Sequence, residues 1–305
     1  MEEKPVKEVK EAEDVREVME KGGGVAAFFD LDGTLIPLPS LEERFFLRLN
    51  EERLIGIRNR LCWLAEAVRL APQGIGQIVN ANKMYLRGVR TEEASGGARL
   101  LVCRSAEDEE AKAGKRTKEP ERQAKMSVLT FFPTAIERAA WHAKRGHLNV
   151  IVSGTLEPLA ALVARTMEAE LGARGLTCNI RVCATRLGEE KERWTGRIVG
   201  EAMFGEAKAR AIRRIAAESD LDLERCFAYG DSLSDRWMLE TVGKPAAVNP
   251  SNDLGRLARR NCWAILRWGG EKSFTQRTRR GTRSQRTEET GRGLQAERVN
   301  SEHGA

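Results

Sequence analysis

Two aspartates one residue apart, Asp30 and Asp32, follow the apolar run "VAAFF". Such a run is typical of a strand covered on both faces, and an ionised carboxylate beside it is costly unless something pairs with it. Asp231 and Asp235 stand close together in "GDSLSD". We expect these four residues to hold one Mg²⁺, because Mg²⁺ takes oxygen ligands. Asp32 would bind through its main-chain carbonyl, and Asp235 directly or through water.

A carboxylate beside a divalent cation could attack phosphorus. We assign Asp30 as the nucleophile, because an aspartyl-phosphate splits one difficult displacement into two easier steps. Asp32 would protonate the leaving alkoxide and then activate the water that clears the intermediate. Lys208, in "GEAK", would offset negative charge on Asp30 and on the transferring group. Asp30, Asp32 and Lys208 are therefore the predicted catalytic residues.

The segment "VSGT" would bind the phosphate. Ser153 and the main-chain N–H groups of Gly154 and Thr155 are expected at a helix start, where free N–H groups hold anions. Gly33 would let the chain turn sharply beside the metal. Thr34 would then hydrogen-bond near the phosphate.

These residues need a scaffold that brings distant segments together. Strand-like and helix-like segments alternate after Phe132, which predicts a doubly wound parallel α/β sheet. The predicted strands are "VAAFFDL", "HLNVIVSGT", "CNIRVCAT", "RCFAYGD", "KPAAVNP" and "CWAILRW". Ligands bind at the carboxyl ends of such strands, where the motif residues fall. The helix after "VSGT" is expected to end with Gly172 in the C′ position.

The segment between the first strand and the rest of the sheet is mainly helical in pattern. Its first helix has capping-box spacing at Ser40 and Glu43, and Trp63 further on could face a substrate. The predicted organisation is a charged N-terminal extension (1–23), a core (24–38 and 131–268), a helical cap (39–130) with a polar excursion (104–125), and a disordered basic tail (269–305).

The composition is that of a globular protein: of 305 residues, 41% are hydrophobic and 31% charged. No stretch suits a signal peptide or a spanning helix, so a cytoplasmic protein is expected. The six cysteines form no C-x-x-C pair, and the three histidines have no zinc-ligand spacing. For His142 and His147 we expect a structural role.

In this order, "DLDGT", "VSGT", "GEAK" and "GDSLSD" resemble the four signature motifs of the haloacid-dehalogenase superfamily of phosphohydrolases. The helical insert after the first motif resembles that of its phosphoserine-phosphatase-like branch, subfamily IB. The resemblance covers roughly residues 24–268 and implies a Rossmannoid core, a mobile helical cap, Mg²⁺ dependence and the roles assigned above. "AVNP" is similar to a loop of that branch, which makes Asn249 a minor phosphate-site residue.

"SGTLEPL" lacks the second glycine and the aromatic residue that phosphoserine phosphatases carry there, which argues against phosphoserine as substrate. The expected function is a Mg²⁺-dependent phosphomonoester hydrolase acting through an aspartyl-phosphate on a small or lipid-linked phosphate ester. Phosphotransfer, or a receiver-type signalling domain that carries phospho-aspartate, is the alternative. A further alternative is a non-catalytic binding module that uses the basic tail.

The net charge of +6 is concentrated toward the tail, around "RTRRGTRSQR". This run could contact nucleic acid or an anionic membrane, but a solvated tail is the expectation, without a nucleic-acid partner. Residues 54–70 of the cap are apolar and basic, which gives a hypothesis of membrane-surface or lipid-phosphate contact. The sequence does not indicate an oligomeric state.

Overall fold

The computed structural model describes residues 23–92 and 129–269. Most of the predicted N-terminal extension, the polar excursion at 104–125 and nearly all of the basic tail lie outside these residues. The domain boundaries given above therefore stay predictions. Within the described residues, no helix is both long enough and apolar enough to cross a bilayer.

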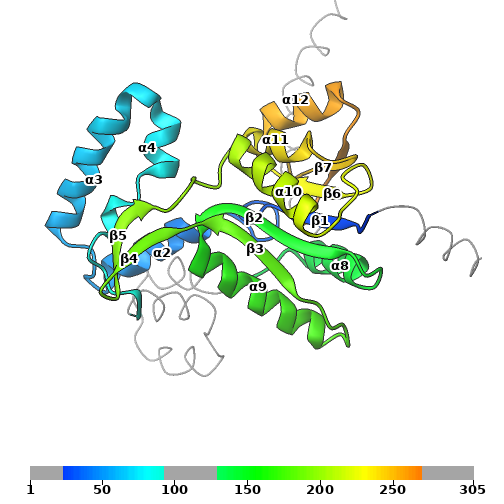
Figure 1. Ribbon diagram of the computed structural model, residues 1–305, viewed down its shortest axis with the longest axis horizontal. Helices are drawn as coiled ribbons and strands as arrows, with labels where there is room; N and C mark the ends of the chain where they lie inside the picture. The colour runs from blue at the N-terminus through cyan, green and yellow to red at the C-terminus, as the bar shows by residue number, and fades with distance from the viewer. Residues whose placement is uncertain (1–22, 93–128, 270–305) are drawn as a thin grey trace, which may run out of the picture. The chain divides into compact units, whose positions relative to one another are not determined.

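A six-stranded parallel sheet in the order β3-β2-β1-β6-β7-β8 forms the centre of the fold (Figure 1). Its strands are β1 (Ala26–Phe29), β2 (Leu148–Leu156), β3 (Ile180–Thr185), β6 (Phe227–Gly230), β7 (Lys244–Val248) and β8 (Ala264–Leu266). β1 lies between β2 and β6, and all four of its residues are buried. The predicted α/β class with a parallel sheet is confirmed.

Helices cover both faces of this sheet. Alternate strand residues point to opposite sides, so each strand contributes apolar side chains to a core on each face. Phe29 and Ile151 belong to a core with α8 (Pro133–Ala143) and α9 (Glu157–Gly172). Phe28 and Val150 belong to a second core, which contains the inner residues of α10 (Glu206–Glu218), α11 (Arg236–Leu239) and α12 (Asn252–Arg260). Both faces of β1 are therefore dry, which accounts for its continuous apolar sequence.

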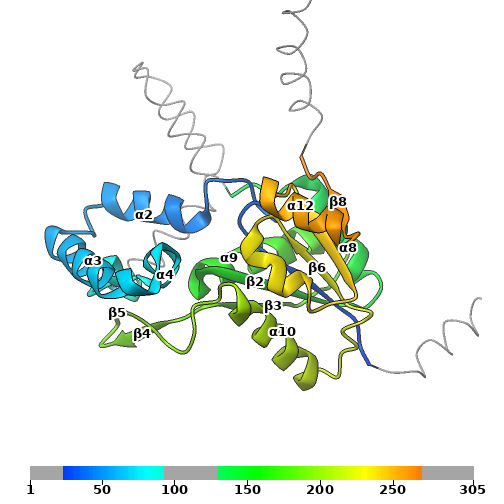
Figure 2. The ribbon, with the colours of Figure 1, turned by 90° about the horizontal axis from the view of Figure 1, so that it is seen from above.

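The helical cap follows β1 directly (Figures 1 and 2). Its described elements are α2 (Leu41–Glu51), α3 (Ile57–Leu70), a 3-10 turn (Ala71–Gln73), α4 (Ile75–Ala81) and a second 3-10 turn (Met84–Leu86). As predicted, Ser40 is the N-cap of α2, and its hydroxyl accepts a hydrogen bond from the N–H of Glu43 at 3.2 Å.

An antiparallel hairpin, β4 (Leu187–Glu190) and β5 (Arg193–Ile198), was not predicted from the sequence. Although it lies in the chain between core elements, β5 pairs with the cap. Gly88 N–H donates to the Trp194 carbonyl at 2.7 Å, and Trp194 N–H donates to the Val89 carbonyl at 3.0 Å. The indole of Trp194 is buried edge-on to Phe45, with ring centroids 6.2 Å apart.

The expected end of α9 is wrong by about one turn. Gly172 is still helical, and Gly175 is the residue that takes the left-handed conformation, with φ of 74°. Leu176 N–H closes the end by donating to the carbonyl of Leu171, which is fully buried. Burial of Leu171 in the core keeps the helix intact past the point where glycine alone would favour a stop.

Candidate active site

The carboxyl ends of β1, β2 and β6 meet at one edge of the sheet. Asp30 follows β1, Asp231 follows β6, and Ser153 lies near the end of β2. The main-chain N–H of Asp30 donates to the Tyr229 carbonyl at 2.9 Å, which holds the ends of β1 and β6 in register. This edge lies where the chain crosses to opposite sides of β1, which is the usual ligand position in an open α/β sheet.

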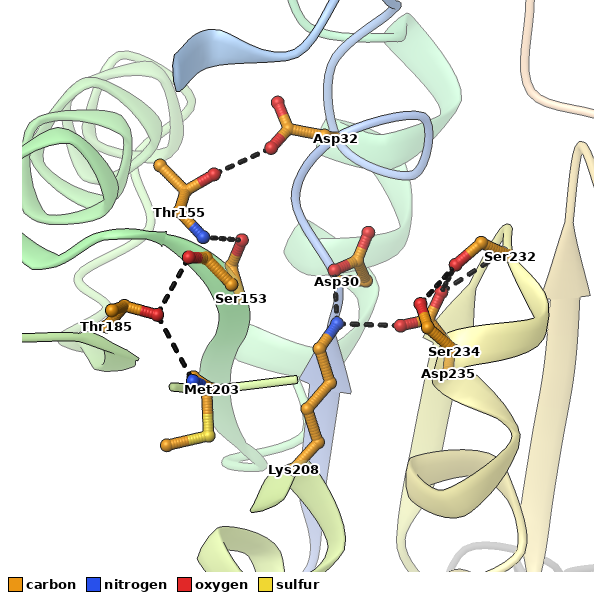
Figure 3. A network of polar contacts seen from close by, with 11 residues as sticks. Asp30, Asp32, Ser153, Thr155, Thr185, Met203, Lys208, Ser232, Ser234 and Asp235 are labelled. Carbon is orange, nitrogen blue, oxygen red and sulfur yellow. Dashed lines mark hydrogen bonds and ion pairs between the residues drawn. The ribbon is translucent and has the colours of Figure 1, made fainter. Parts of the chain in front are cut away.

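Three carboxylates gather there. Asp30, Asp231 and Asp235 each place one oxygen within 4.8 Å of the others. Lys208, from α10, reaches between two of them: its Nζ donates to Oδ1 of Asp30 at 2.5 Å and to Oδ1 of Asp235 at 2.6 Å (Figure 3). The side chains of Asp30, Lys208 and Asp235 are almost fully buried. One ammonium thus contacts two buried carboxylates, and a third, the half-buried Asp231, lies beside them.

This imbalance appears in the acid–base behaviour. Burial raises the pKa of Asp30 well above its usual value; Lys208 lowers it, and the nearby charges of Asp235 and Asp231 raise it further. Burial and the charge of Asp235 raise the pKa of Asp231 to about 7. Burial lowers the pKa of Lys208, but Asp235 and Asp30 outweigh that effect, so the net shift is upward. Further positive charge would relieve the repulsion, and the oxygen donors fit Mg²⁺.

Gly33 permits the close approach of the two acidic segments. Its φ is +83°, and a Cβ at this position would lie 2.3 Å from Oδ2 of Asp231. Its N–H donates to the Ile36 carbonyl at 2.7 Å, closing the turn after β1. A side chain at Gly33 would therefore push the 30–34 turn away from Asp231.

Asp32 lies beside the three-carboxylate cluster, but its side chain points toward Thr155 and not toward the cluster (Figure 3). Its Oδ1 accepts from the N–H of Leu41, the first residue of α2, at 2.6 Å, and its Oδ2 accepts from the Thr155 hydroxyl at 2.7 Å. Burial raises the pKa of Asp32, while the hydrogen bonds from Thr155 and Leu41 oppose that shift. The assignment of its main-chain carbonyl to the metal stays a prediction.

The "VSGT" segment lies in the site but not at a helix start. Ser153, Gly154 and Thr155 belong to β2, and α9 begins only at Glu157. The N–H of Thr155 donates to Oγ of Ser153 at 3.2 Å, so it already has a partner in the protein, whereas a free N–H group was expected. The carbonyl of Gly154 accepts from the Thr185 hydroxyl at 2.8 Å, which ties the segment to β3.

Two predicted phosphate-binding residues do not line the cavity at this site. Thr34 is fully buried, and its hydroxyl has no partner among the described residues. Asn249 has φ of 43°, and its amide donates to the Trp268 carbonyl at 2.8 Å while its Oδ1 accepts from the Trp268 N–H at 2.9 Å. The side chain of Asn249 is thus committed to holding the chain after β8, contrary to the phosphate role expected for it.

A cavity of about 1050 Å³ opens from the acidic cluster toward the cap. Its core side includes all the catalytic and metal-binding candidates together with Ser153, Gly154 and Thr155. Its cap side is mixed: it includes the apolar Phe46, Leu47 and Trp63, the last as anticipated from the sequence, together with polar and charged residues.

Sequence reasoning missed a polar cluster on the cap side of the cavity. Oε1 of Glu42 accepts from Lys83 Nζ at 2.5 Å and from the Tyr85 hydroxyl at 2.7 Å. Glu42 is 41 positions from Lys83 and 43 from Tyr85, so no local pattern indicates these contacts. Ser232 was also missed: its hydroxyl donates to Oδ2 of Asp235 at 2.9 Å. The S-x-x-D spacing could have indicated that contact.

His142 and His147 lie outside this cavity, as their expected structural role requires. Nδ1 of His142 is 2.9 Å from Nδ1 of His147, and its Nε2 is 2.9 Å from the Tyr229 hydroxyl. Of the cysteines, Cys183 and Cys226 are buried as free thiols.

Comparison with known proteins places the chain in a family. A Mycobacterium tuberculosis protein named "Probable phosphatase Rv3661" is 34% identical over 146 residues, which are 48% of this chain and 47% of that protein. "Phosphoserine phosphatase SerB1" of the same species is 36% identical over 129 residues, 42% of this chain and 39% of that protein. The chain thus spans less than half the length of these relatives.

A solved structure, described as a protein with unknown function from Bordetella pertussis Tohama I, is 26% identical with a TM-score of 0.50. The match covers 80% of this chain and 98% of that one, which supports the fold. Residues 27–240 match the family described as haloacid dehalogenase-like hydrolase. This range contains all four motifs, so the predicted resemblance is confirmed. The chain belongs to the haloacid dehalogenase-like hydrolase family.

Proposed function

We propose that the protein is a Mg²⁺-dependent phosphomonoester hydrolase that acts through an aspartyl-phosphate on Asp30. The observation that carries this proposal is the contact of Lys208 with Asp30 and Asp235 at the floor of the cavity, with Asp231 beside them. A buried nucleophile, a fixed ammonium and a cation-binding set of oxygens suit attack on a phosphate dianion. The names of the relatives support a phosphatase.

In the first step, Asp30 would attack phosphorus. Lys208 occupies Oδ1 of Asp30, so the carboxylate is held in one orientation and Oδ2 is the oxygen left to attack. Asp30, Asp231 and the main-chain carbonyl of Asp32 would hold Mg²⁺, with Asp235 as a direct or water-mediated ligand. When bound, Mg²⁺ supplies positive charge that offsets the charge of the phosphate. Ser153 would donate its hydroxyl to a phosphoryl oxygen.

Asp32 would transfer protons in both steps. Burial raises the pKa of Asp32, which is the direction that a general acid for the leaving alkoxide requires. The resulting carboxylate would then accept a proton from the water that attacks the phosphorus of the intermediate. The hydrogen bonds from Thr155 and Leu41 fix the orientation of the carboxyl group between the core and the first turn of the cap.

The test is a phosphate-release screen over phosphoserine, sugar phosphates, nucleotides and lysophosphatidate, with Mg²⁺ or with EDTA. Asp30→Asn should lower kcat by about a thousandfold or more, because it removes the nucleophile. Asp253→Asn is a matched control, since Asp253 is an exposed aspartate on α12 that does not line the cavity. Turnover by Asp30→Asn at the parent rate, or full activity in EDTA, would disprove the proposed mechanism.

The same site could pass the phosphoryl group to an alcohol instead of water. Supplying an acceptor such as glycerol during turnover distinguishes the two outcomes, because a phosphotransferase forms a new phosphate ester at the expense of free phosphate. A receiver domain is disfavoured by the cavity of about 1050 Å³ walled by the cap, which suits an organic substrate. The further alternative, a non-catalytic module that binds through the basic tail, depends on residues that lie outside those the structure describes, so it stays a hypothesis.

A further inference from the structure

Helix α3 carries a row of large apolar side chains that face solvent. Ile57, Leu61, Leu64 and Val68 are exposed by 71%, 58%, 55% and 69%. Their spacing of four, three and four residues places them on one face of the helix. Isolated exposed apolar residues are ordinary, but a contiguous row of four marks a surface that contacts something. We call these four residues the α3 stripe.

The opposite side of α3 is the one that packs on the protein. Ala67 and Leu70 are its buried residues, and the amide of Asn59 donates to the carbonyls of Tyr85 and Arg87 at 2.9 and 2.8 Å. At 3.6 residues per turn, Asn59 and Leu70 lie opposite the stripe, and Ala67 lies at the border between the two sides. The stripe is therefore not required to attach α3 to the rest of the cap.

Arginines border the stripe on both sides. Helical geometry places Arg60 along one margin, where its guanidinium donates to Oδ1 of Asn50 at 3.1 Å, and Arg58 and Arg69 along the other. Arg58 makes no hydrogen bond or ion pair with another part of the chain that the structure describes, and Arg69 pairs with Glu66 at the surface. An apolar face with basic margins is the pattern of helices that lie in the plane of an anionic lipid surface.

The same helix forms part of the cavity wall. Arg60 and Trp63, both on α3, line the cavity that contains Asp30. Figures 1 and 2 show α3 at the outer edge of the cap, far from the sheet. A surface that contacted the stripe would therefore lie next to the cavity wall formed by this helix.

We propose that α3 docks the protein on an anionic membrane surface, with the α3 stripe among the acyl chains and Arg58 and Arg69 at the headgroups. A second copy of the chain is the less suitable occupant, because symmetric pairing of two stripes would bring Arg58, Arg60 and Arg69 of both copies together. Docking goes beyond the proposed hydrolase activity and does not depend on it. It predicts that phosphate esters presented at a lipid surface reach the cavity.

The test is co-sedimentation of the full chain with vesicles of phosphatidylcholine alone, or with one third phosphatidylglycerol. Binding should require the anionic lipid and should weaken with added salt. Leu61→Ser with Leu64→Ser should lower the partition coefficient more than about tenfold, because apolar area no longer leaves water. Arg58→Gln with Arg69→Gln should lower it about 25-fold, or about fivefold for each arginine.

Val199→Ser with Ile265→Ser is the control, since both side chains are exposed and neither is on α3. This variant should bind as the parent does. Equal binding by the Leu61/Leu64 variant and the parent, with both folded by circular dichroism, would overturn the proposal and assign binding to another segment. Absence of binding, or equal binding to neutral vesicles, would also overturn it. So would a dimer that the Leu61/Leu64 variant converts to monomer, because a second copy would then cover the stripe.

Discussion

Lowering the pH from about 7.5 to about 5 should charge His142 in the unfolded chain but not in the folded protein. His142 has no solvent exposure, and burial lowers its pKa from 6.5 to about 3; the positive charges of His147, Arg138 and Arg145 act in the same direction. Below pH 6.5 the unfolded chain takes up a proton that the native protein does not. His142 therefore costs no stability above pH 6.5 and costs progressively more as the pH falls toward 3.

The magnitude follows from the gap between the two pKa values. Each pH unit below 6.5 costs about 1.4 kcal/mol, so at pH 5 the expected loss is about 2 kcal/mol. The measurement is urea unfolding of the parent and of His142→Gln at several pH values between about 4 and 8. Glutamine keeps a side-chain amide for hydrogen bonding but does not titrate.

The informative quantity is the difference between the two stability curves, because the carboxylates that also titrate in acid are common to both proteins. The free energy of unfolding of the parent should fall more steeply than that of His142→Gln, by about 1.4 kcal/mol per pH unit below pH 6.5. The two curves should run parallel above pH 6.5. Parallel curves over the whole range would refute a neutral, buried His142.

Three substitutions test other contacts. Lys208→Met should lower the free energy of unfolding at neutral pH by about 3–5 kcal/mol, since it leaves buried carboxylates unpaired; unchanged urea unfolding would contradict the pairing. Gly33→Ala should lower kcat more than about tenfold, because its Cβ would meet Asp231; steady-state kinetics at the parent rate would exclude that clash. Trp194→Ala should destabilise the protein by about 3 kcal/mol in thermal unfolding, since it empties the space beside Phe45. A loss below about 1 kcal/mol would mean that this indole does not hold the hairpin to the cap.

The core of the fold could be predicted because its signals are local. β1 is a continuous apolar run, and Asp30 and Asp231 come directly after strands whose carboxyl ends must meet in a parallel sheet. Convergence of Asp30, Asp231 and Asp235 follows from that topology, and the structure places them together. The match to the family rests on the same motifs.

What could not be predicted depends on contacts distant in sequence. The β4–β5 hairpin turns at Lys191 and Glu192, which both have positive φ, instead of at the Asn-Gly or Asp-Gly pair that usually indicates such a turn. In the sequence, Asn249 looks like a free loop residue. In the structure, its side-chain amide makes two hydrogen bonds to the main chain of Trp268, which is 19 positions later. The Glu42 cluster of the cap depends on the folding back of α3 and α4, which no residue near Glu42 encodes.

The pairing of β5 with the segment after the second 3-10 turn limits how substrates can enter. The cap is joined to the core by its covalent connections. It is also joined to the β4–β5 hairpin by three main-chain hydrogen bonds, two between Trp194 and residues Gly88 and Val89 and one from the Thr91 N–H to the Glu192 carbonyl. A swing of α2 to α4 away from the acidic residues must either carry the hairpin along or break those bonds, at about 1 kcal/mol each. When substrate enters or leaves, the cap and the hairpin would then move together about the short links at both ends of the hairpin. These links are far from the aspartates themselves.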